Sequence, residues 1–167
     1  SGDACVLHLD ARTLQFRSTF GRDHFVGPAA GMALVGDELY VGSRPDHTLL
    51  VFSLSGCLLK RITGEWREPE RMLHVGGRLY LFEQEGASEV NEHHHDGPWP
   101  DDKEQAGRQI FVLSPDGETL QIWFTARSAQ DDEEFCPWVY EMGAFGQKLV
   151  VIQGGPARKE LVALQGM

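Results

Sequence analysis

The stretch VGDELYV occupies residues 35–41, and closely related stretches follow as VGGRLYL at 75–81 and FGQKLVV at 145–151. In each copy a methionine stands four residues before the glycine; these are Met32, Met72 and Met142. An apolar run meets a short polar turn containing glycine, and a second apolar run follows. Because glycine supplies the positive φ of a tight turn, each copy predicts a β-hairpin.

A second kind of unit alternates with these hairpins, at residues 6–20, 51–62 and 111–124. Each predicts a strand, a turn and another strand, and SPDGET at 114–119 has the residues of a clear turn. We align these units on three leucines, each followed by Asp or Ser: Leu9, Leu54 and Leu113. A truncated further copy, LVALQGM at 161–167, follows the third hairpin.

The repeats predict an all-β fold. No window shows a helical apolar period, whereas a unit of about 45 residues with four short strands indicates a β-propeller. We therefore expect one propeller-like domain over residues 1–167, with about three four-stranded blades. Propellers close with about four to eight blades, so this one should be incomplete or open. A β-sandwich would share the short strands but not the methionine and glycine kept in step.

Composition narrows the classes of partner. A net charge of −10, with only 15 Lys and Arg residues, argues against nucleic acid binding. No apolar stretch is long enough for a membrane span. Cys5, Cys57 and Cys136 form no paired motif, which weakly favours a reducing, intracellular compartment. The first residues do not read as a signal peptide, although a chain whose targeting peptide had been removed would read the same.

Residues 25–64 resemble an NHL repeat, a β-propeller unit. The matching residues are Pro28, Gly36, Leu39, Tyr40, Val41, His47, Val51, Phe52 and Gly56, while Asp46 stands where the family usually has Asn. The second unit keeps Pro69, Gly76, Leu79, Tyr80 and Leu81, and the third drifts toward the Gly-Gly ending of kelch repeats at Gly154 and Gly155. The resemblance implies a propeller fold and, most often, protein–protein binding.

An insertion at residues 83–107 interrupts the second unit and is rich in acidic residues. It predicts a polar, solvated surface loop. Within it, His93 and His95 alternate along the chain and could share a divalent metal ion such as zinc. Trp99 lies between two prolines and is a candidate protein-docking residue, followed by Asp101 and Asp102.

A second acidic loop covers residues 129–138. Its acidic residues, Asp131, Asp132, Glu133 and Glu134, could contact a basic protein surface, although a solvated connection is the simpler interpretation. Their spacing matches no calcium-binding loop.

No catalytic motif or cofactor-binding motif occurs in the chain, so we expect no catalytic residues and no cofactor beyond the metal considered above. Some NHL-like propellers are metal-dependent lyases or hydrolases, and that alternative requires His24, His47 and His74 to converge. The sequence favours a non-catalytic propeller segment that binds proteins, as an accessory or structural subunit of a larger complex. A third hypothesis is a self-associating scaffold, in which a second copy of the chain completes the propeller.

Overall fold

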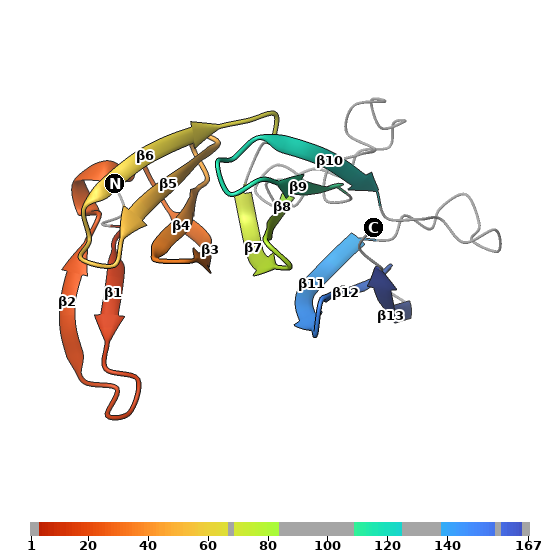
Figure 1. Cartoon of the computed structure of the whole chain (residues 1–167), viewed down its shortest axis with the longest axis horizontal. Helices are drawn as coiled ribbons and strands as arrows, with labels where there is room; N and C mark the ends of the chain where they lie inside the picture. The colour runs from red at the N-terminus through yellow and green to blue at the C-terminus, as the bar shows by residue number, and fades with distance from the viewer. Residues whose placement is uncertain (1–3, 67–68, 84–108, 125–137, 156–157, 165–167) are drawn as a thin grey trace, which may run out of the picture.

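The computed structural model describes residues 4–66, 69–83, 109–124, 138–155 and 158–164. Its strands form four antiparallel sheets that follow one another along the chain (Figure 1). A two-stranded sheet, β1 (Val6–Leu9) and β2 (Phe16–Phe20), comes first. It is followed by a one-turn 3₁₀ helix, η1 (Arg22–His24).

Two four-stranded sheets occupy the middle of the chain. The first contains β3 (Ala29–Val35), β4 (Glu38–Ser43), β5 (Thr48–Ser53) and β6 (Leu58–Thr63) in that order. The second contains β7 (Pro69–Val75), β8 (Arg78–Glu83), β9 (Gln109–Leu113) and β10 (Thr119–Phe124). A three-stranded sheet of β11 (Trp138–Phe145), β12 (Lys148–Gly155) and β13 (Arg158–Leu164) ends the series.

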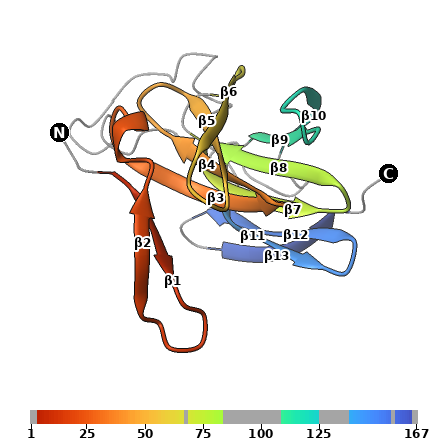
Figure 2. The same ribbon diagram turned by 60° about the vertical axis from the view of Figure 1, so that its left-hand side comes forward.

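The sheets are arranged as the blades of an incomplete propeller. Their innermost strands, β3, β7 and β11, contact one another in succession, while β6 and β10 lie on the outside (Figures 1 and 2). The all-β, propeller-like prediction is therefore confirmed, and the described sheets do not close into a ring. Among the described residues, no helix is long and apolar enough to cross a membrane.

The three inner hairpins share one backbone design. Each has a two-residue loop whose first residue is a glycine with φ near +60°, at Gly36, Gly76 and Gly146. In each hairpin the strand pairing also shifts by one residue. The shift follows the residue that stands three positions before the repeated methionine. The residues at that position are Ala29, Pro69 and Val139. A register shift repeated in this way shows that the hairpins are structurally equivalent.

The outer hairpins are equivalent too, and their turns correct the alignment made from sequence. The Ser53 side chain accepts from the Cys57 N–H at 3.1 Å, and Ser114 accepts from the Glu118 N–H at the same distance. Asp10 caps the first turn by accepting from the N–H groups two and three residues later. Leu9, Phe52 and Leu113 therefore correspond, and Leu54, which the sequence aligned with Leu9 and Leu113, lies two residues further on, in an exposed turn.

Apolar packing between sheets forms the core. We call the face of a sheet turned toward the preceding sheet its leading face, and the opposite face its trailing face. One cluster joins the trailing face of β3–β6 to the leading face of β7–β10, and a second joins β7–β10 to β11–β13. A third joins Val6 of the two-stranded sheet to Val41, Leu50 and Phe52. Trp66, in the connection from β6 to β7, packs edge-on against Phe111 within the first cluster.

A polar contact accompanies the apolar packing between the two four-stranded sheets. Tyr40 on β4 is fully buried, and its hydroxyl donates to the carbonyl oxygen of Pro115 in the β9–β10 turn. The Nζ atom of Lys60, on β6, lies 3.5 Å from the same carbonyl oxygen and 5.5 Å from the centre of the Tyr40 ring. The pair thus ties the outer part of one sheet to the turn of the next.

The contact around Tyr40 predicts a loss of stability in alkali. Burial raises the pKa of Tyr40. Burial alone would lower the pKa of Lys60, but interactions with Tyr40, Glu38 and Asp116 outweigh it and raise that pKa. Because the folded protein holds both protons more tightly than the unfolded chain, the stabilisation is complete below about pH 10 and is lost as pH rises above it. Urea unfolding between pH 8 and 11 should show a shallower alkaline decline for Tyr40→Phe than for the wild type, and equal declines would contradict the assignment.

Glycine permits the close approach of β3 to β7. A Cβ at Gly31 would lie 2.6 Å from the Cα of Arg71, whereas a Cβ at Gly143 on β11 would meet nothing within 4 Å. Gly31→Ala should therefore lower the free energy of unfolding by about 1–3 kcal/mol through overpacking. Gly143→Ala is the matched control on an equivalent strand, and its effect should be within about 0.5 kcal/mol of zero. Thermal unfolding of both variants tests this, and equal losses would show that β3 and β7 are not closely packed.

Candidate interaction surface

The repeated methionine shows where the stack of sheets lacks a neighbour. Met72 and Met142 are buried, with 8% and 9% of their surface exposed, because the preceding sheet covers their leading faces. Met32 is the equivalent residue on β3, and it is 57% exposed. Leu34 lies two residues further along the same face and is also exposed. Residues of one type at one repeat position thus differ only in what covers them.

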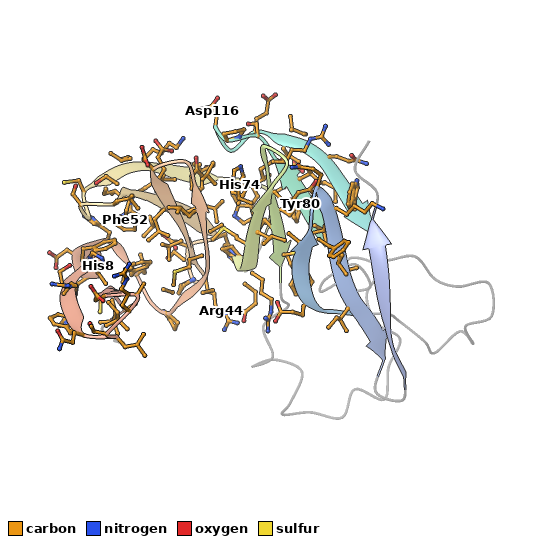
Figure 3. The ribbon with its side chains drawn as sticks, turned by 60° about the horizontal axis from the view of Figure 1, so that its bottom comes forward. His8, Arg44, Phe52, His74, Tyr80 and Asp116 are labelled. Carbon is orange, nitrogen blue, oxygen red and sulfur yellow. The ribbon has the colours of Figure 1, made fainter. Side chains whose placement is uncertain are left out.

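The two-stranded sheet covers only the outer half of this leading face. Phe20 on β2 packs against Phe52 with ring centres 5.4 Å apart, and Phe25 adds a second ring contact to Phe52. Figure 3 shows Phe52 on the side of its sheet that carries the hairpin with His8. Val6 completes this cover. We call the uncovered inner half, floored by Met32 and Leu34, the inner gap.

The leading face of the two-stranded sheet is itself uncovered. Leu7 and Leu9 on β1 are 61% and 45% exposed, and Phe16 pairs with Leu9 on the same face. Their equivalents in the next two sheets are at most 1% exposed; they are Leu50 and Phe52 in one, and Phe111 and Leu113 in the other. The sequence pattern therefore places core residues at a surface.

The last sheet has the same property on its trailing face. Phe145 and Ile152 are exposed there, while their equivalents in the preceding sheet, Val75 and Phe82, are buried against β11–β13. Apolar side chains that core positions normally bury are thus exposed at both ends of the stack. Exposed apolar patches of this kind mark contact surfaces.

Ion pairs link the inner strands across the internal junctions. Arg44, which follows β4, pairs with Glu70 on β7, and the next residue, Arg71, pairs with Glu141 on β11. In Figure 3, Arg44 lies at the end of its sheet near the following one. The Arg44–Glu70 pair is the more buried, and the Nε of Arg44 is buried without a hydrogen-bond partner among the described residues. The inner rim of the stack is therefore charged at the internal junctions.

The binding residues predicted from sequence cannot be placed on these surfaces. The candidate metal ligands His93 and His95 lie outside the described residues. So do the candidate protein-binding residues, which are Trp99, Asp101, Asp102, Asp131, Asp132, Glu133 and Glu134. Their roles stay predictions.

The described histidines come from separate elements. His24 lies in η1 with its ring 6.0 Å from that of Phe52, His47 lies between β4 and β5, and His74 lies in β7. Figure 3 shows His8 and His74 far apart. In the described part of the chain, no three His, Cys, Asp or Glu side chains are grouped so that they could hold a metal ion. The convergence that a metal-dependent lyase or hydrolase would require is therefore not found there.

Comparisons with known proteins identify the fold and no more. No protein-family model and no curated protein matches the chain. Among solved structures, the chain is similar to a propeller-like one titled hydrazine synthase, from Kuenenia stuttgartiensis, with a TM-score of 0.53 and 15% sequence identity. The likeness covers 95% of this chain and 43% of the other, so this chain spans less than half the length of that structure. In that neighbour the matching part is therefore less than half of the chain.

The two inner-rim ion pairs should differ in strength. Glu70→Gln leaves the partly buried Arg44 without its counter-charge and should cost about 1–3 kcal/mol of stability. Glu141→Gln removes a more exposed pair and should cost about 0–1 kcal/mol. Chemical denaturation of both variants measures the difference. A larger loss for Glu141→Gln would contradict the order of burial.

Proposed function

We propose that this chain is a non-catalytic β-propeller segment that acts as a protein–protein interaction module within a larger assembly. The observation that carries the proposal is the contrast between equivalent residues. Leu7 and Leu9 are exposed where Leu50, Phe52, Phe111 and Leu113 are buried. Burying one such side chain is worth about 1.5–3 kcal/mol, so faces of this composition favour contact with another protein surface.

Two further observations support the proposal. In the similar solved structure, the matching part occupies 43% of the chain, so an arrangement of this kind exists within a larger structure. The resemblance of residues 25–64 to an NHL repeat points the same way, because NHL propellers most often bind proteins. The acidic residues of the two predicted loops would then meet a basic partner surface.

Association of the purified 167-residue chain tests this proposal. We expect size-exclusion chromatography with light scattering to show a mass above that of the monomer, rising with protein concentration. Replacing Leu7 and Leu9 with threonine, which keeps strand propensity, should weaken this association at least about tenfold. Leu54→Thr is the matched control, because Leu54 is comparably exposed but lies in the turn between β5 and β6, outside the two terminal sheets.

The outcomes discriminate clearly. A wild-type chain that stays strictly monomeric, and that binds no hydrophobic dye at its end faces, would contradict the proposal. An association that Leu54→Thr weakens as much as the double variant does would show general stickiness in place of a defined surface.

A further inference from the structure

The inner gap has the shape of a missing β-hairpin. The first sheet contains β1 and β2, and their equivalents in the next sheets are β5 with β6 and β9 with β10. In those sheets, β5 pairs with β4 and β9 pairs with β8. Among the described strands, β1 pairs with β2 alone. Within the described part of the chain, the first sheet therefore consists of an outer hairpin without an inner hairpin.

The apolar residues that floor the gap, Met32 and Leu34, independently indicate that a β-hairpin would fill it. At the next junction, the inner strands β7 and β8 place Leu73, Val75, Tyr80 and Phe82 in the apolar cluster that covers Met142 of the following sheet. Met32 and Leu34 occupy the equivalent floor without such a cover. An occupant that buries them as Met142 is buried must carry alternating apolar side chains on one face, as an amphipathic strand pair does.

Among the strands that the structure describes, none pairs with the second edge of β1, so this edge is available for strand addition. Lys and Pro are two of the residues that protect sheet edges, and the sequence of β1, VLHL, contains neither; β1 is nonetheless short, and its pairing with β2 shifts register between His8 and Leu9. An added strand would pair its backbone with this edge while its side chains fill the gap. A free edge and an uncovered apolar floor thus lie together, and a single two-stranded element satisfies both.

A second copy of the chain fits this gap poorly. In a head-to-tail pair, the three strands β11–β13 would meet the two strands β1–β2, one strand more than the four of a complete sheet. Moreover, β13 and β1 both correspond to the third strand, so they would compete for one position.

We propose that the inner gap is a docking site for an antiparallel β-hairpin with alternating apolar residues, which adds to the edge of β1 and covers Met32 and Leu34. The inference deepens the proposed function and rests on it, because it names the chemistry of one partner. The hairpin completes the first sheet as a four-stranded blade.

A hairpin peptide tests the proposal directly. The probe is a fluorescent peptide with the sequence of residues 69–83, cyclised through a two-residue turn, because Pro69 and Glu83 are paired ends. Cyclisation reduces the ordering cost of binding. We expect saturable binding to the 167-residue chain in fluorescence anisotropy. Met32→Asp with Leu34→Asp should weaken it at least about tenfold, while Leu54→Asp should leave it unchanged.

Hydrogen exchange separates strand addition from nonspecific apolar contact. Bound peptide should slow exchange of the amide protons of β1, and the thermal unfolding of both aspartate variants should confirm that they fold. Undiminished binding to the Met32 and Leu34 variant, or binding without protection of β1, would overturn the inference.

The remaining outcomes are also decisive. A dimer of the chain that Met32→Asp and Leu34→Asp dissociate would assign the gap to a second copy and overturn the hairpin. If the peptide fails to bind while association still depends on Leu7 and Leu9, the docking inference fails and the proposed function stands. If neither the peptide nor any protein surface associates with the chain, both fail.

Discussion

The constraint on which this structure depends is that every sheet is apolar on both faces. In β3–β6 the leading face presents Val41, Leu50 and Phe52, and the trailing face presents Tyr40, Leu49 and Val51. A sheet of this kind is stable only when something covers each face, since exposed apolar area costs free energy in proportion to its size. Stacking successive sheets satisfies this requirement at each internal junction and leaves it unsatisfied at both ends.

Repetition explains why the sequence predicted the fold well. Met32, Met72 and Met142 keep step with the loop glycines because each inner hairpin has the same register shift and the same loop. These are local requirements of the backbone, so they are written into neighbouring residues. The alignment of Leu54 with Leu9 and Leu113 was wrong because two serines near the β5–β6 turn could each have been its capping residue. The structure shows that Ser53, and not Ser55, caps this turn, and the sequence alone does not distinguish the two.

The candidate surface could not be predicted in this way, because exposure at a repeat position depends on which sheet precedes it. Nothing in the residue type distinguishes Met32 from Met72, yet the first lies open and the second is covered. The sequence instead directed attention to conspicuous histidine and tryptophan residues such as His93, His95 and Trp99, which lie outside the described residues.

The internal junctions and the inner gap also differ in what can confer specificity. At the internal junctions, apolar packing is joined by charged contacts on the inner strands, from Glu70 and Arg71 on β7 to Arg44 and Glu141 on either side. The strand that floors the gap reads AAGMALV and offers no charge. Since apolar contact alone selects partners weakly, selectivity at the gap must come from geometry. The strand pairing offered by β1 and the fixed spacing of Met32 and Leu34 supply it, which is why a two-stranded element suits this site better than a charged surface does.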